Sequence, residues 1–158
     1  MADNAEGGIV TFIDPSLVDD TWTDPENVKK RFQNFGVENV VHHRATTQEF
    51  VETDEYRSLG ELGIVFIDGN HTEEQARFDY EAFADRVPPD GMILLHGSVR
   101  MEESSIYGED QTYRRTVKLF VDELKQNPTL QVFDVPFQDG LTLVRRTDRK
   151  TEPHRPTD

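Results

Sequence analysis

The sequence predicts an α/β fold in which a mostly parallel sheet, covered by helices, ends in an antiparallel hairpin. Strand and helix patterns alternate along most of the chain, which is typical of parallel sheets with helical crossovers. Apolar runs such as Gly63–Ile67 show no polar alternation and indicate strands buried on both faces. Gln138–Gly140 separates the last two strand-like segments as a hairpin turn does. We therefore expect one domain over residues 1–146 and a charged, flexible tail over 147–158.

Local signals bound the predicted elements. Proline cannot donate to a strand ladder, so the first strand ends before Pro15. Asp24 and Pro25 start the first helix, Gly36 ends it, and Thr72 caps a later one. The predicted strands are 9–13, 37–43, 63–67, 92–96, 131–137 and 141–146. The predicted helices lie within 24–36, 46–51, 72–87 and 113–124, and 97–110 forms a polar loop between elements.

Composition excludes several classes of function. The formal net charge of −14 argues against nucleic acid and anionic membranes as partners, because both are bound through clustered Lys and Arg. The chain has no cysteine, so any metal must be held by oxygen or imidazole ligands. It has no apolar run long enough to span a membrane, and its start lacks the features of a signal peptide. We expect a soluble, acidic, cytoplasmic protein with a small-molecule substrate.

An acid and an imidazole follow the apolar strand at Gly63–Ile67. Asp68 comes directly after this strand and His71 three residues later, while His96 ends the next strand. In open α/β sheets, ligands bind in the crevice beyond the carboxyl ends of the strands. Asp68 and His71 are therefore expected to point into such a crevice, although His71 could instead be a polar residue that flanks the helix start at Thr72.

Several motifs occur together in an order that resembles one family. They are Thr11-Phe12-Ile13-Asp14-Pro15, Phe66-Ile67-Asp68-Gly69-Asn70-His71, Pro89-Asp90-Gly91-Met92-Ile93-Leu94-Leu95-His96 and the terminal hairpin. From about Gly8 to Arg146 the chain resembles the class I S-adenosylmethionine-dependent methyltransferases, and more narrowly the catechol and macrolide-sugar O-methyltransferases. This resemblance implies a Rossmann-like methyltransferase sheet and S-adenosyl-L-methionine as cofactor.

The resemblance also implies cofactor-binding residues. Asp14 matches the acid that holds both ribose hydroxyls of the cofactor, and a carboxylate suits a vicinal diol because each oxygen can accept one hydroxyl proton. Ala45, Thr46 and Thr47 resemble the loop on the adenine side of the cofactor. The alternatives are structural: Asp14 could form the turn before proline, and Thr46 or Thr47 could simply cap a helix.

By the same resemblance, Asp68 ligates a divalent cation such as Mg²⁺ or Ca²⁺, and His71 is the catalytic base. A hard cation would lower the pKa of the substrate oxygen to be methylated, and imidazole suits proton transfer near neutral pH. Relatives continue with an acid after the strand that ends at His96, but this chain has Gly97. His96 is then either a ligand better suited to transition metals or a strand-end residue. The 97–110 loop is expected to cover the substrate.

One part of the family pattern has no counterpart. The first strand of the family and its glycine-rich turn are not found, and no Gly-x-Gly occurs in the sequence. The chain could be a fragment of a longer enzyme, could pair strands 9–13 and 64–67 directly, or could leave a slot that a partner or second copy fills. We accordingly expect a homo-oligomer or a partnered chain. The leading function is small-molecule O-methylation; the alternatives are a non-catalytic methyltransferase-like fragment that acts by association and a nucleotide-binding module.

Overall fold

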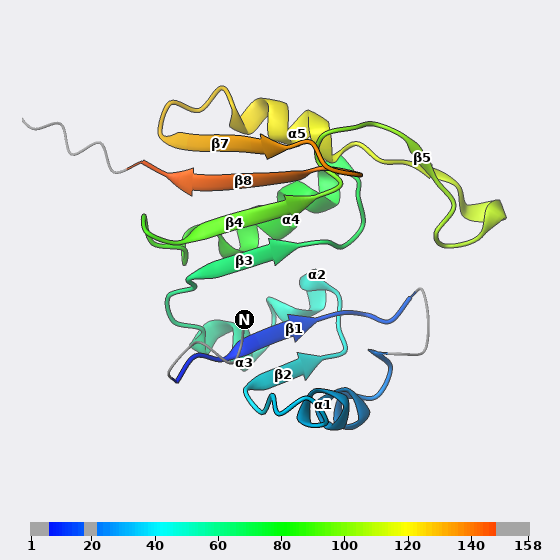
Figure 1. Cartoon of the computed structure of the whole chain (residues 1–158), viewed down its shortest axis with the longest axis vertical. Helices are drawn as coiled ribbons and strands as arrows, with labels where there is room; N and C mark the ends of the chain where they lie inside the picture. Colours follow the sequence, from blue (N-terminus) through cyan, green and yellow to red (C-terminus); the bar gives the residue numbers. More distant parts are fainter. Residues whose placement is uncertain (1–6, 18–21, 148–158) are drawn as a thin grey trace, which may run out of the picture. The chain divides into compact units, whose positions relative to one another are not determined.

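The structure is a computed structural model that describes residues 7–17 and 22–147. Most of the predicted tail, from residue 148 onward, lies outside the described residues. The strands are β1 (Val10–Ile13), β2 (Val40–His43), β3 (Ile64–Ile67), β4 (Met92–His96), β5 (Glu103–Ser104), β6 (Tyr113–Arg114), β7 (Leu130–Val135) and β8 (Leu141–Arg146) (Figure 1). The helices are α1 (Pro25–Gln33), α2 (Thr47–Phe50), α3 (Asp54–Ser58), α4 (Glu73–Ala84) and α5 (Val117–Leu124), with a 3₁₀ turn at Glu109–Gln111.

Contacts divide the chain into two compact units. One holds the described residues up to Leu59 together with Ser105–Thr112, and the other holds Gly60–Ser104 and the described residues from Tyr113 onward. None of the described helices is long and apolar enough to cross a bilayer.

The first unit is built on two parallel strands. β1 pairs with β2 in a register that runs from Val10 opposite Val40 to Ile13 opposite His43. Helix α1 packs on β2 and buries Val28, which is 1% exposed. The predicted first helix and second short helix are both present. α3 was not predicted, because it is little more than one turn held by its cap and shows no apolar period.

The start of α1 gives a direct test of these local signals. Asp24 accepts a hydrogen bond from the backbone N–H of Glu26 at 3.0 Å. Asp24→Ala removes this acceptor and is expected to lower the free energy of unfolding by about 1 kcal/mol in urea melts followed by circular dichroism. Asp24→Asn keeps an acceptor oxygen, so its free energy of unfolding should stay close to that of the native chain. Equal losses of unfolding free energy in both variants would contradict the capping role.

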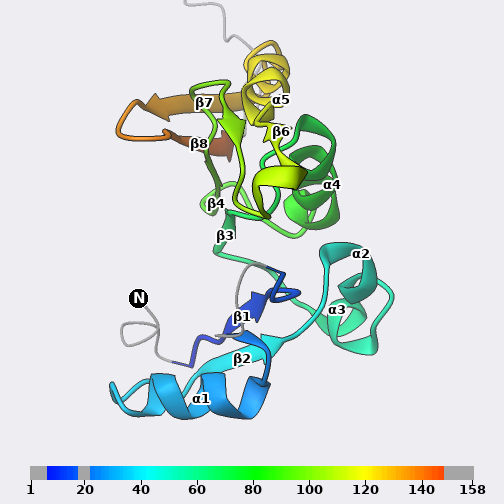
Figure 2. The ribbon, with the colours of Figure 1, turned by 90° about the vertical axis from the view of Figure 1, so that its right-hand side faces the viewer.

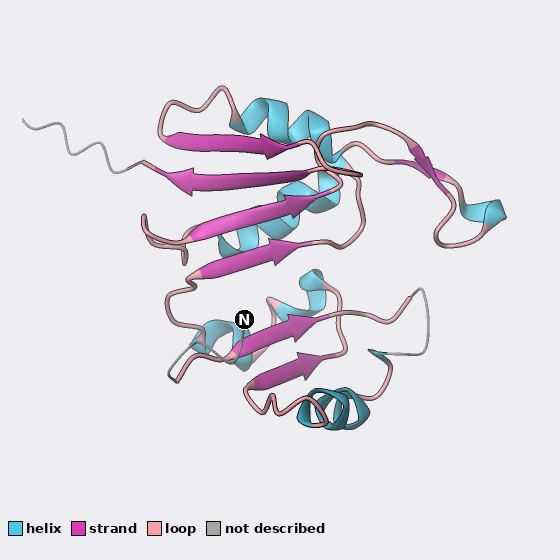
Figure 3. Cartoon of the chain, in the orientation of Figure 1, coloured by secondary structure: helices cyan, strands magenta, loops and turns pink. Residues whose placement is uncertain are grey.

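The second unit contains a four-stranded sheet in the order β3-β4-β8-β7. β3 and β4 are parallel, and β8 and β7 form the predicted antiparallel hairpin beside β4. Helices α4 and α5 cover one face of this sheet (Figures 2 and 3). The core between them includes Leu95 and Val121, both 0% exposed, with Val117 and Phe120 at 2%.

The prediction that strand β3 is buried on both faces is wrong. Ile67 is buried, but Ile64 and Phe66 are 54% and 57% exposed. Among the described strands β3 pairs only with β4, and both helices lie on one face of the sheet. The apolar run therefore places alternate side chains against the helices and leaves the others on the opposite face.

The 97–124 region also differs from its prediction. Strands β5 and β6 form a short hairpin within the stretch predicted as a polar loop and the start of a helix. The backbone N–H of Arg115 continues this pairing by donating to the carbonyl of Glu102 at 2.7 Å, so α5 begins only at Val117. Tyr113 fits the apolar period of α5 because it precedes Val117 by four residues, yet its backbone is extended.

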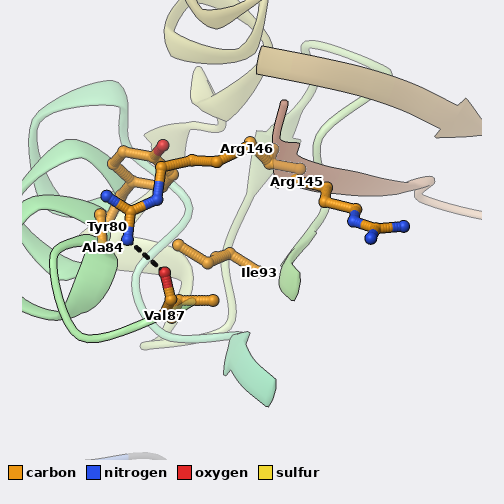
Figure 4. A pocket seen from close by; sticks show the side chains of 7 residues that line it. Tyr80, Ala84, Val87, Ile93, Arg145 and Arg146 are labelled. Carbon is orange, nitrogen blue, oxygen red and sulfur yellow. Dashed lines mark hydrogen bonds between the residues drawn. The ribbon is translucent and has the colours of Figure 1, made fainter. Parts of the chain in front are cut away.

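A pocket lies at the amino end of β4. Tyr80, Ala84, Val87, Ile93, Val144, Arg145 and Arg146 line it (Figure 4). Arg146 donates to the backbone carbonyl of Val87, and this bond ties the end of β8 to the turn after α4. Since Ile93 is opposite Val144 while His96 is opposite Leu141, this pocket and His96 lie at opposite ends of β4.

Candidate functional site

Asp68, His71 and His96 come together beyond the carboxyl ends of β3 and β4. The two strands are parallel with Ile67 opposite Leu95, so the residues that follow them emerge at the same edge. Asp68 Oδ1 lies 3.1 Å from His71 Nε2 and 2.6 Å from His96 Nδ1. The two imidazole rings meet edge to face, with centroids 5.3 Å apart. The structure thus brings together the three residues that the sequence placed at this edge.

A single carboxylate oxygen joins the two imidazoles. An ionised carboxylate only accepts hydrogen bonds, so His71 Nε2 and His96 Nδ1 each donate to it whenever they carry a proton. Burial raises the pKa of the Asp68 carboxyl, but the hydrogen bonds and charges of His71 and His96 outweigh burial. The pKa of Asp68 consequently lies below its ordinary value, which keeps this carboxylate ionised.

The three side chains differ in their access to solvent. The His71 side chain is 10% exposed, whereas those of His96 and Asp68 are 32% and 45% exposed. The cluster is therefore anchored on one side by a buried ring and open on the other. A small molecule can reach Asp68 and His96 without displacing the core.

His71 is held by a residue that the sequence reasoning missed. The backbone N–H of Thr116 donates to the carbonyl of His71 at 2.8 Å, and the Thr116 hydroxyl accepts from the N–H of Glu73 at 2.8 Å. Thr116 thus fixes the backbone on both sides of Thr72, the N-cap of α4. No pattern near His71 could have revealed this, because Thr116 is more than forty positions away along the chain.

Gly97 explains why no acid follows His96. Its φ is +62°, and a Cβ atom built on it would lie 2.7 Å from His71 Nδ1 and 2.8 Å from His71 Cε1. L side chains rarely adopt this backbone conformation, and the buried imidazole occupies the space that a side chain would need. The acid that the family resemblance implies after this strand is therefore incompatible with the observed position of His71.

The predicted cofactor residues belong to the first unit. Asp14 follows β1, and its Oδ1 accepts from the backbone N–H of Ser16 at 2.6 Å, as a turn-forming Asp does. Thr46 caps α2 with a complete capping box: its hydroxyl and its N–H bond to Glu49, whose N–H donates back to the hydroxyl. Ala45 and Thr47 flank this cap and are partly buried. These structural roles are present, while the proposed roles toward a cofactor stay predictions.

The adjacent histidines of β2 point to opposite faces, as the strand geometry predicts. His42 is buried and stacks on Phe12 with centroids 5.1 Å apart, and His43 contacts Phe50 at 4.9 Å. Burial lowers the pKa of His42, although the charge of Asp14 acts in the opposite direction. Neither ring joins a group of metal-ligating side chains among the described residues.

The structure shows an open α/β sheet with an acid and two imidazoles at its carboxyl edge. Comparisons with known proteins identify this fold as that of a Rossmann-like methyltransferase. A family model described as a methyltransferase domain matches residues 1–98, and the chain belongs to that family. Tricin synthase 2 of Oryza sativa subsp. japonica is 32% identical over 91 residues, which are 55% of this chain and 31% of that protein.

Solved structures share the fold at low sequence identity. An O-methyltransferase of Bacillus cereus in complex with SAH has a TM-score of 0.65 at 12% identity, over 90% of this chain and 64% of that one. The O-methyltransferase TomG of Streptomyces achromogenes, in complex with SAM, has a TM-score of 0.63 at 15% identity over the same shares. The chain thus spans less than two thirds of these solved methyltransferases and about a third of the curated relative.

Proposed function

We propose that this chain takes part in the S-adenosylmethionine-dependent O-methylation of a small molecule, with Asp68 and His71 at the reacting hydroxyl. The observation that carries the proposal is the contact between Asp68 Oδ1 and His71 Nε2 at the carboxyl edge of the sheet. Membership of the methyltransferase-domain family and the SAM and SAH complexes of proteins with this fold support it.

The proposed chemistry needs one proton acceptor beside the nucleophile. S-adenosylmethionine, when bound, would supply the methyl group to the substrate oxygen and leave as S-adenosylhomocysteine. In the neutral tautomer that carries its proton on Nδ1, His71 has a free lone pair on Nε2, and the substrate hydroxyl proton would pass to this nitrogen. Asp68 Oδ1, 3.1 Å from this nitrogen, then stabilises the imidazolium. Products are the methyl ether and S-adenosylhomocysteine. Alignment of methyl donor and nucleophile supplies most of the remaining rate enhancement.

The residues predicted to bind S-adenosylmethionine differ in how many hydrogen-bonding groups they have left for it. The carboxylate of Asp14 uses Oδ1 for the Ser16 N–H, and a carboxylate has enough acceptor sites to bind ribose hydroxyls as well. The hydroxyl of Thr46 already donates a hydrogen bond to Glu49 and accepts one from it. These helix-capping bonds engage the hydroxyl, which disfavours it as a ligand of the cofactor. We therefore keep Asp14 as the ribose ligand and assign the adenine side to the backbone around Ala45 and Thr47.

Calorimetric titration with S-adenosylmethionine and S-adenosylhomocysteine tests this proposal. Asp14→Ala should weaken binding, whereas His71→Ala should preserve binding and slow methyl transfer to a catechol acceptor by about 100-fold or more. Asp90→Ala removes an exposed carboxylate at the amino end of β4 and serves as the matched control. Loss of binding in His71→Ala with normal binding in Asp14→Ala would refute the two roles.

A second function is association without catalysis, and one observation favours it. β3 has a strand on one side only among the described residues, and Ile64 and Phe66 are more than half exposed on it. Open apolar strands of this kind pair with other chains. If neither cofactor form binds at millimolar concentration, association in a homo-oligomer or with a partner becomes the better account. Sedimentation of the purified chain would then measure it.

A further inference from the structure

We infer that Asp68, His71 and His96 together bind a transition-metal ion of the Zn²⁺ or Co²⁺ type, in preference to Mg²⁺ or Ca²⁺. This inference deepens the proposed function, because it assigns the kind of ion that the same site holds. It uses one carboxylate oxygen and two imidazole nitrogens as ligands. His71, the proposed base, thereby becomes a ligand whenever the ion is bound.

The donor atoms are already close to coordinating positions. Each of the three residues offers one ligand atom, and these atoms lie within 4.8 Å of one another. In a tetrahedral zinc site, bonds of about 2.0–2.1 Å place neighbouring ligand atoms about 3.3 Å apart. The two contacts with Asp68 Oδ1, at 3.1 and 2.6 Å, are near this spacing. Small side-chain movements would therefore suffice to admit an ion.

The type of ligand decides between the two classes of ion. Mg²⁺ and Ca²⁺ require oxygen ligands, usually from more than one carboxylate or carbonyl group. Here Asp68 is the single carboxylate of the group among the described residues, and Gly97 contributes no side chain. Two imidazoles with one carboxylate suit zinc and the neighbouring transition metals, which accept nitrogen readily. The chemistry of the cluster thus disfavours a hard cation.

The surroundings hold the ligands in place and leave room for a further one. His71 is fixed through the Thr116 hydrogen bond to its carbonyl and through the close approach of Gly97 to its ring. Asp68 and His96 come from paired strands, and their side chains are 45% and 32% exposed. Water or a substrate hydroxyl can therefore complete the coordination, as at zinc sites with an open position. An ion held here would lower the pKa of that hydroxyl.

Metal titration of the tag-free, chelator-treated chain tests the inference without any cofactor. Co²⁺ should bind one ion per chain with the visible absorption of a four- or five-coordinate site, and Zn²⁺ should displace it. Mg²⁺ should not compete at equal concentration. His96→Ala and Asp68→Asn are each expected to weaken Zn²⁺ binding at least about 10-fold, the lower end of what even outer-shell changes cost. His43→Ala leaves all three ligands intact and should bind Zn²⁺ as the native chain does.

Several results would overturn the inference. One is Zn²⁺ affinity unchanged in both His96→Ala and Asp68→Asn; another is tighter binding of Mg²⁺ than of Zn²⁺. Far-ultraviolet circular dichroism establishes that each variant is folded. The His96 and Asp68 side chains are both more exposed than that of His71, so substitutions there disturb core packing less. Because no cofactor is present in the titration, a failure here is separate from a failure of S-adenosylmethionine binding, which alone would refute the proposed function.

Discussion

The Gly97→Ala variant is expected to have a free energy of unfolding about 2–5 kcal/mol below that of the native chain and to separate His71 from Asp68. Two physical terms add up at this position. The φ of +62° costs an L residue about 1–2 kcal/mol. The new methyl group would also lie 2.7 Å from His71 Nδ1, and overpacking of this kind costs about 1–3 kcal/mol.

The same substitution in a His71→Ala background is the matched control. With the imidazole removed, the atoms nearest to the new Cβ are gone, and only the backbone term of about 1–2 kcal/mol remains. Urea unfolding of the four chains, native, single and double variants, gives the interaction energy between the two positions. Strict additivity would show that Gly97 is required by its backbone alone and not by the packing of His71.

The Leu95→Ala variant is expected to lower the free energy of unfolding by about 3 kcal/mol, within the usual range of 2–5 kcal/mol for buried Leu. Leu95 is 0% exposed on β4, which pairs with β3 on one side and β8 on the other. It belongs to the core cluster that includes Val121 and Phe120. Removing three carbon atoms leaves a cavity that paired strands on both sides cannot close.

Leu119→Ala makes the same chemical change at an exposed position. Leu119 is 44% exposed on α5, and alanine favours helix, so the expected loss is below about 1 kcal/mol. Urea unfolding of Leu95→Ala and Leu119→Ala measures the loss of unfolding free energy in each. The difference between the two losses is the effect of burial, because the chemical change is the same. Similar losses at both positions would contradict the assignment of the core between the sheet and its helices. His96 directly follows Leu95 on β4 and would also lose its support if β4 shifted in the Leu95→Ala variant.

Elements with strong local signals were predicted well. Asp24 and Pro25 start α1, Thr46 caps α2, and Gly140 helps to turn the final hairpin, because caps and turns depend on a few neighbouring residues. The start of α5 was misplaced because Arg115 pairs with Glu102 in a hairpin. That pairing competes with the helix and does not show in apolar periodicity.

The sequence predicted which residues form the candidate site, but it did not predict all the contacts among them. Asp68 and His96 follow apolar strands, and parallel pairing brings the ends of such strands together. The sequence could not show that both imidazoles contact the same carboxylate oxygen. This contact is what changes the expected ion from Mg²⁺ or Ca²⁺ to a transition metal, since it adds His71 to the ligands.

The sequence by itself determined the α/β class, the order of most elements, the methyltransferase family and the three residues at the carboxyl edge of the sheet. These depend on periodicity, turn chemistry and motif order, all of which are local in the chain. Only the tertiary structure decided that Thr116 holds the backbone of His71 and that Gly97 must lack a side chain beside its ring. Those two facts arise from contacts between segments far apart in sequence, where space and hydrogen-bond geometry, not residue pattern, set the outcome.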